Sequence, residues 1–284
     1  IHCLGLSTWV KNLKSVLNQR NIKIFYKFCD LLGKGGFASV YLSENLETNE
    51  KVAVKIFNKN NGDEKSIELV KTEIEILRCC RHDNILSYID YFEDHENIYL
   101  VSEFMESGDL TDVLKNESLM DEKKIKALLR QIGSGLRYLH GYGIIHRDLK
   151  PQNILIKDYP PHIVLKIGDF GLSKVMGRNE TTSDCLGTIF FSSPEVIMNK
   201  RYNNKIDVWS LGIILYILLF GGVPFNDNKS NQTDIAKRIC TEELIIPNTR
   251  QLSNDLVNLL KGCLDKNYHK RFSIKEVLNH KWFV

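Results

Sequence analysis

The 284-residue sequence lacks several common patterns, and each absence excludes a class of protein. No apolar run reaches the roughly 20 residues of a membrane-spanning helix, because the longest, LGIILYILLFGGV from Leu211, is shorter and predicts a buried helix. The seven cysteines are scattered and include no C-x-x-C pair, so no metal or redox centre is indicated and a reducing cytosol fits best. A net charge of +3 provides no basic field, so neither nucleic acid nor an anionic membrane is expected as a partner.

The chain also shows no secretory signal, internal repeat or low-complexity tract. It begins at Ile1 without a Met, so we expect a fragment from which a targeting segment could be missing. The stretch NDNKSNQTD, residues 226–234, predicts a surface loop. The length is sufficient for one catalytic unit with a large core, divided into two lobes around a cleft.

The hydrophobic patterns predict a strand-rich part followed by a helix-rich part. Strand-like runs dominate from about Phe25 to Glu103, and one helix with the apolar stripe Ile67, Val70, Ile74 and Leu77 interrupts them. A long core helix follows Asp121, and further helices are predicted near 206–219, 253–263 and 273–280. Two short strands are predicted in ILI and IVLKIG.

A glycine-rich stretch, GKGGFASV, follows an apolar strand. Gly33, Gly35 and Gly36 have no side chains, so backbone N–H groups there can close over phosphate oxygens. An ordinary glycine hairpin is the alternative. Because Ala38 stands where a dinucleotide-binding motif needs its third glycine and no helix follows, that fold is disfavoured.

The strand EKVAVKIF places Lys55 on one face with Ala53 and Phe57. A lysine there is commonly a solvated edge residue unless an anion lies opposite. Glu73, at the margin of the helical stripe, is the candidate partner, and such a pair could direct the ammonium toward phosphates.

The segment GIIHRDLKPQNILI sets an Asp, two cations and an Asn between apolar runs, and KIGDFG follows it closely. Phosphoryl transfer needs such a set: Asp148 to accept a hydroxyl proton, Lys150 to offset developing charge, and Asn153 with Asp169 to hold Mg²⁺. The apolar flanks would fix the geometry of this loop.

Together these motifs resemble the eukaryotic protein kinase family. GKGGFASV, VAVK, TEIEIL, HRDLKPQN, DFG, SPE and DVWSLG occur in the family's order from about Phe25 to the end of the chain. The resemblance implies an α+β, two-lobed fold with a small antiparallel β lobe carrying one helix and a larger, mostly helical lobe. We expect an extension at 1–24, the small lobe at 25–104 and the large lobe at 105–284.

The resemblance also implies roles for individual residues. Asp207 would brace the catalytic loop, and Glu195 with Arg271 would form a structural ion pair. ATP and Mg²⁺ are the expected cofactors. The residues expected to bind ATP are Leu32, Gly33, Lys34, Gly35, Gly36, Val40, Ala53, Lys55, Glu73, Ser102, Glu103, Met105 and Leu155.

Further motifs indicate which kinases are most similar. Lys150 in DLKPQN and Thr188 in GTIFF are typical of serine/threonine kinases acting on protein substrates. The segments VLNHKWFV and LLFGGVPF and the spacer KDYPPHIVLKIGDFG resemble the calcium/calmodulin-dependent group, most closely the calcium-dependent kinases of plants and protists. No D-x-D-x-D-G loop with a closing Glu occurs, so a regulatory calcium-sensing segment is expected outside this chain. A nucleotide-binding pseudokinase scaffold and a small-molecule kinase are the alternatives.

The sequence also suggests how kinase activity is controlled and which inhibitors and substrates the chain prefers. Asp184 is expected to supply a built-in negative charge near Arg147, with phosphorylation of the neighbouring residues 181–183 as the alternative. A small Ser102 before the adenine-binding EFM should open a pocket to bulky inhibitors. Asp109 matches a place that favours basic substrates, whereas Gln152 weakens that expectation.

The N-terminal segment LSTWVKNLKSVL is amphipathic. It resembles the last helix of a pleckstrin-homology domain, and a helix that packs on the small lobe or on membrane is the alternative.

Overall fold

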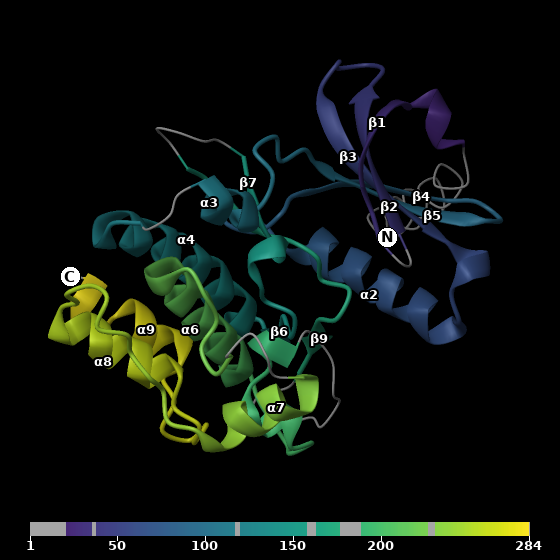
Figure 1. The fold of residues 1–284 in the computed structure, drawn as a ribbon. Coiled ribbons are helices and arrows are strands. Elements are labelled where there is room, and N and C mark those ends of the chain that lie inside the picture. Colours follow the sequence, from purple (N-terminus) through teal and green to yellow (C-terminus); the bar gives the residue numbers. More distant parts are fainter. Residues whose placement is uncertain are drawn as a thin grey trace, which may run out of the picture. The chain divides into compact units, whose positions relative to one another are not determined.

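The computed structural model describes residues 21–35, 38–116, 120–157, 163–176, 189–226 and 231–283. The chain divides into two compact units (Figure 1). The first comprises the described residues up to Cys80 together with Leu86–Met105, and the second comprises Arg81–Ile85 and the described residues from Glu106 onward. Each unit is treated below by itself.

The first unit is built on an antiparallel sheet with the strand order β1-β2-β3-β5-β4. The strands are β1 (Tyr26–Lys34), β2 (Ala38–Asn45), β3 (Lys51–Asn58), β4 (Tyr88–Glu93) and β5 (Asn97–Glu103). The 3₁₀ helices η1 (Ile22–Ile24) and η2 (Lys59–Asn61) and the helix α2 (Glu64–Cys79) complete the described part of this unit. Strands β1 and β2, which flank the glycine-rich stretch of the sequence, pair antiparallel.

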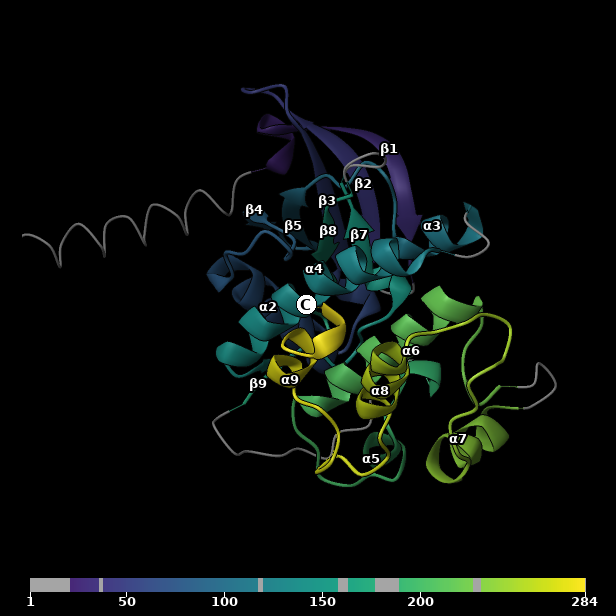
Figure 2. The same cartoon turned by 90° about the vertical axis from the view of Figure 1, so that its left-hand side faces the viewer.

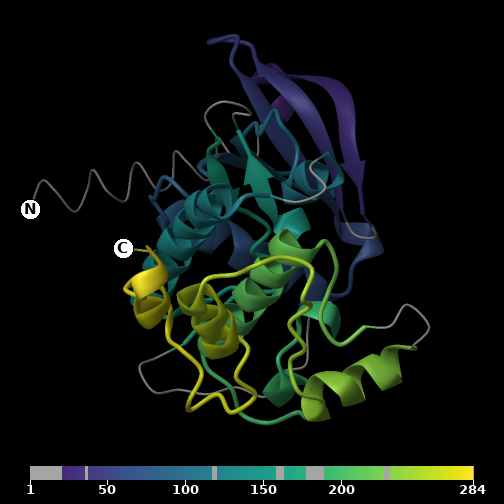
Figure 3. The same cartoon turned by 60° about the vertical axis from the view of Figure 1, so that its left-hand side comes forward.

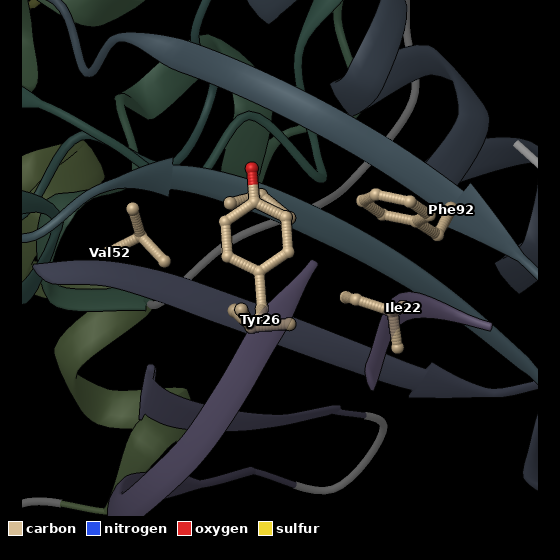
Figure 4. Packing of buried hydrophobic residues seen from close by; sticks show 6 residues of the cluster. Ile22, Tyr26, Val52 and Phe92 are labelled. Carbon is tan, nitrogen blue, oxygen red and sulfur yellow. The ribbon is translucent and has the colours of Figure 1, made fainter. Parts of the chain in front are cut away.

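One face of the sheet is closed by residues at the start of the described chain. Val52 and Val54 lie two residues apart on β3 and therefore share this face. They pack with Ile22, Tyr26 and Phe92 in a buried cluster (Figure 4). The Phe92 ring lies 5.9 Å from the Tyr26 ring in an edge-on arrangement. Strand β4 is thereby packed against β1, although the two strands stand at opposite edges of the sheet order.

Helix α2 begins where the sequence provides a cap. The Asp63 side chain accepts the N–H of Ser66 at 2.9 Å, which satisfies one of the free donors of the first turn. The predicted stripe is largely confirmed, because the buried residues of α2 are Val70, Glu73, Ile74, Ile76 and Leu77.

The second unit is mostly helical. Its α-helices among the described residues are α3 (Leu110–Asn116), α4 (Glu122–Gly141), α5 (Pro194–Ile197), α6 (Lys205–Phe220), α7 (Gln232–Thr241), α8 (Asn254–Cys263) and α9 (Ile274–Leu278). Short hairpins pair β6 (Ile144–Ile145) with β9 (Lys174–Val175) and β7 (Ile154–Ile156) with β8 (Leu165–Ile167). The 3₁₀ helices are η3 (Pro151–Asn153), η4 (Ile189–Phe191) and η5 (Lys281–Phe283). The predicted α+β class, with a small antiparallel unit carrying one α-helix and a larger helical unit, is confirmed for the described residues.

Helix α6 is the centre of the second unit. Its residues from Ile206 to Leu219 are all buried, so the apolar run of the sequence is a core helix, as predicted. Helices α4 and α8 pack against it, and α9 packs against α4 (Figures 2 and 3). The helix ends at Gly221, whose φ of 74° gives the left-handed conformation that glycine adopts most easily. Within the described ranges, no helix is long and apolar enough to cross a membrane.

Two expectations from the sequence need correction. The end of NDNKSNQTD is not loop, because Asn231 accepts the N–H of Asp234 at 2.9 Å and starts α7 at Gln232. The helix predicted at 273–280 stops at Leu278, and the chain turns into η5. The amphipathic segment and the site residues Gly36, Asp184 and Thr188 lie outside the described residues.

Candidate active site

In the first unit, the ion pair that the sequence predicted is present. Lys55 Nζ on β3 lies 2.8 Å from Glu73 Oε1 and 3.0 Å from Glu73 Oε2 on α2. The Glu73 side chain is only 3% exposed and that of Lys55 is 23% exposed. A carboxylate this buried needs a cation, since leaving it unpaired would cost several kcal/mol, about 3 to 5 in comparable cases. The pair therefore fixes the ammonium group relative to the sheet.

The strand register places further candidate residues around Lys55. Val40 on β2 is the cross-strand partner of Lys55, and Ser102 on β5 is the partner of Ala53. Because side chains alternate along a strand, Ala53, Lys55 and Ser102 share one face of the sheet. Ser102 is buried and small. All three are residues that the family resemblance implies for ATP binding.

The remaining candidates of the first unit lie at the ends of strands. Glu103 ends β5, and its Oε1 accepts the N–H of Ser87 at 2.8 Å, which secures the chain just before Met105. Leu32, Gly33 and Lys34 are exposed near the end of β1. Gly35 N–H donates to Ala38 O at 2.8 Å, which closes the turn between β1 and β2. A side chain added at Gly33 would meet nothing within 4 Å, so the backbone there is open to a ligand.

In the second unit, Asp148 is held by two neighbouring side chains. Its Oδ2 lies 2.6 Å from Lys150 Nζ and 3.2 Å from Asn153 Nδ2, and Asn153 Nδ2 also donates to Asp148 O at 2.8 Å. Asp148 Oδ1, by contrast, is buried and has no hydrogen-bond partner. Buried polar atoms are nearly always paired, so an orphaned carboxylate oxygen indicates a group that completes the site.

The backbone before Asp148 adopts an unusual conformation. Arg147 has a φ of 68°, which is uncommon for a residue with a side chain. Asp207 Oδ1 accepts the N–H of Arg147 and Asp207 Oδ2 accepts that of His146, each at 3.0 Å. The predicted bracing of the loop by Asp207 is therefore confirmed, and it offsets the strain at Arg147.

Asp207 remains ionised although it is fully buried. Burial opposes its charge, but hydrogen bonds from His140 and from the His146 backbone, together with the fields of both histidines, hold its pKa below the usual range. A buried anion of this kind is a strong and rigid acceptor for the loop.

The two candidate metal ligands are joined through a hairpin. Gly168 N–H donates to Asn153 O at 2.9 Å, and β7 and β8 pair immediately beside it. Asp169 follows Gly168 with a φ of 58° and is exposed between buried neighbours. Because Asn153 Nδ2 is turned toward Asp148, the amide oxygen of Asn153 points the other way.

These groups fit Mg²⁺ and a bound phosphate. Amide and carboxylate oxygens are the ligands that Mg²⁺ prefers, and it is usually bound by one or two side chains together with substrate phosphates. In the part of the chain that the structure describes, no group of three or more His, Cys, Asp or Glu could hold a metal alone. Asn153 and Asp169 would therefore hold the ion only with help from the substrate.

Other residues singled out in the sequence make structural contacts within the second unit. Arg271 and Glu195 form a bidentate ion pair with N–O distances of 2.6 and 2.9 Å, which confirms the predicted pair. Leu155 lies on β7 and bridges to Asp109. The Asp109 carboxylate accepts the N–H of Thr111 at 2.7 Å at the start of α3, so this residue has a local structural role.

Sequence reasoning missed His140. Its Nε2 lies 2.8 Å from Asp207 Oδ2, and its side chain is 5% exposed. The available signal was its position directly after Leu139 on the apolar side of the long core helix, where a polar residue needs a partner.

Comparisons with known proteins agree with this geometry. The protein kinase domain model matches residues 26–283. Myosin light chain kinase A of Dictyostelium discoideum is 34% identical over 92% of this chain and 88% of its own length. Calcium-dependent protein kinase 5 of Plasmodium berghei is 36% identical over 89% of this chain and 44% of its own length.

A third relative has similar coverage. The probable serine/threonine-protein kinase fhkC of Dictyostelium discoideum is 36% identical over 91% of this chain and 44% of its own length. The chain thus spans about half the length, or less, of most of the curated relatives it matches. With the match extending over nearly all of the described sequence and the expected resemblance confirmed, the chain belongs to the protein kinase family.

Proposed function

We propose that this chain transfers the γ-phosphate of ATP to serine or threonine hydroxyls of protein substrates. The observation that carries the proposal is the unpaired, buried Oδ1 of Asp148 beside a fully paired Oδ2. A hydroxyl must lose its proton as it attacks phosphorus, and an oriented carboxylate oxygen is the group that accepts it.

Each side chain near Asp148 has a separate task in this proposal. Lys150 and Asn153 hold Oδ2, so that Oδ1 is directed at the incoming hydroxyl. Lys150 is also close enough to offset negative charge that develops on the transferred group. Asn153 and Asp169 would hold Mg²⁺, which when bound supplies charge neutralisation for the phosphates.

The proposed nucleotide-binding residues lie in the first unit. Lys55, oriented by Glu73, would contact the phosphates. The open backbone at Gly33 would bind phosphate oxygens, and the Glu103–Met105 backbone would bind adenine, with Leu32, Val40 and Ala53 as apolar neighbours.

The relatives support the choice of substrate class. Two of them are named as myosin light chain kinases, two as calcium-dependent kinases and one as a serine/threonine kinase. We therefore propose a serine/threonine kinase of the calcium-dependent type, with a calcium-sensing segment outside this chain. The domain boundaries at 24 and 104 and a cytoplasmic location remain predictions.

The test is a kinase assay with Mg-ATP on a serine/threonine peptide library. We expect the parent chain to phosphorylate peptides, and Asp148→Asn to lower kcat by roughly 10²- to 10⁴-fold. Asp94→Asn, which changes a carboxylate of the β4–β5 turn, is the matched control and should keep the parent rate. Nucleotide-dependent thermal stabilisation without phosphate transfer would instead favour a pseudokinase scaffold.

The hypothesis on activation has its own test. If Asp184 supplies the charge that partners Arg147, phosphatase-treated parent chain should stay active and phosphatase-treated Asp184→Ala should not. Full activity of the treated variant would refute this idea.

A further inference from the structure

The buried carboxylate of Asp207 accepts hydrogen bonds from three groups. Two are the backbone N–H groups of His146 and Arg147, each at 3.0 Å. The third is His140, whose Nε2 lies 2.8 Å from Oδ2. Because an ionised carboxylate can only accept, the His140 ring must carry a proton on Nε2.

The two backbone donors belong to the segment that positions Asp148. The His146 ring accepts the N–H of Asp148 at 3.3 Å through Nδ1 and donates from Nε2 to Gly168 O at 3.0 Å. A small displacement of His146 and Arg147 would therefore reach both Asp148 and the residue before Asp169. The positive φ of Arg147 makes this segment prone to relax once its contacts weaken.

His140 has the means to prevent such a displacement. It lies near the C-terminal end of α4, directly after the fully buried Leu139, and α4 packs against α6, which carries Asp207. The ring shares Oδ2 with the His146 N–H. Without this donor, a fully buried carboxylate would keep only two neutral backbone partners and would tend to turn or to take up a proton.

We propose that His140 is a positioning residue for phosphoryl transfer, which acts through Asp207 to set the backbone of His146 and Arg147 and thereby the orientation of Asp148. The role rests on the proposed function of Asp148. A histidine that only fills the core would affect stability but not the turnover of folded molecules.

Two substitutions separate these roles by geometry. In His140→Gln the side-chain amide nitrogen can occupy the place of Nε2 and donate to Asp207. In His140→Asn the amide nitrogen corresponds to Nδ1 and is too short to reach. Both variants are polar and smaller than histidine, and Asn is the smaller of the two, but a packing loss alone would lower stability rather than the kcat of folded molecules. Ser134→Ala is the control, because it removes another histidine contact of the same helix, between Ser134 Oγ and His82 Nε2 at 3.2 Å.

The variants are compared in the full chain by steady-state kinetics with Mg-ATP and a peptide. We expect His140→Asn to lower kcat about 10- to 100-fold, as small misplacements of catalytic groups do, with KM values for ATP and peptide changed less than about twofold. His140→Gln should keep kcat within about threefold of the parent. Ser134→Ala should match the parent.

Equal kcat values for the Gln and Asn variants would overturn the proposal, whether both are active or both are impaired. If the parent itself transfers no phosphate, the proposed function fails, and positioning is then measured without turnover. Hydrogen exchange of the backbone amides of residues 144–149 should be faster in His140→Asn than in His140→Gln. Equal exchange in the two variants would exclude the role of His140.

Discussion

Breaking the buried ion pair between Glu195 and Arg271 should strongly destabilise the second unit, because it leaves an unpaired charge in the core. The Arg271 side chain is 0% exposed and that of Glu195 is 4% exposed. In Glu195→Met the guanidinium loses both carboxylate bonds and keeps, among the described residues, the carbonyls of Asp265 and Lys205 and the face of Trp209. We expect a loss of about 3 to 5 kcal/mol, the usual cost of an unpaired buried charge. Total stabilities of about 5 to 15 kcal/mol make this a severe change.

The assay is urea unfolding at pH 7, followed by circular dichroism. The control is Glu242→Met, which breaks the exposed pair with Arg238 at 3.6 Å and should cost less than about 1 kcal/mol. The double variant Glu195→Met with Arg271→Met should lose less than either single variant, because no unpaired charge remains in the core. A loss in Glu195→Met no larger than in the control would refute the reasoning that burial makes this pair costly to break.

Three further predictions concern the candidate site. Glu73→Gln should lower kcat/KM for ATP by about tenfold or more because Lys55 loses its orienting charge, and unchanged kinetics would contradict that role. Ser102→Met should weaken ATP-competitive inhibitors that carry a bulky aromatic group, since the side chain shares a face with Ala53; equal potency against both forms would count against the pocket. The pKa of Asp207 is held below its usual value of 3.8, so its contribution to stability is complete above about pH 5 and is lost as the pH falls through the lowered pKa. Acid titrations should therefore show the advantage of the parent over Asp207→Asn shrinking below about pH 4, and a constant difference down to pH 2 would be inconsistent with this assignment.

Much of the site followed from the sequence because the relevant signals are local. Period-two alternation placed Lys55 with Ala53, and the stripe of α2 placed Glu73 at its margin. Each pattern reflects a backbone period, so the faces could be assigned before any contact was known. The pairing of Lys55 with Glu73 then followed from the cost of a carboxylate near the core.

Other features depend on contacts between distant segments and could not be read from local patterns. The left-handed conformation of Arg147 is stabilised by Asp207, 60 residues later, which accepts its N–H. The start of α7 within a polar stretch depends on the Asn231 cap, a single short-range bond in a segment whose composition predicts a loop. His140 gave no motif of its own, and its role becomes visible only beside Asp207.

The position of Asp207 in the first turn of α6 has a consequence for heating. Residues Ile206–Leu219 of α6 are all buried, so we expect the backbone amides of this helix to exchange with solvent only when the second unit unfolds as a whole. The loop that carries Asp148 is hydrogen-bonded to this helix, which we expect to unfold last, and not to an element at the surface of the unit. Surface elements such as α7 can unfold locally with rising temperature while the loop that carries Asp148 keeps its geometry. Activity should therefore be lost in a single step, together with global unfolding.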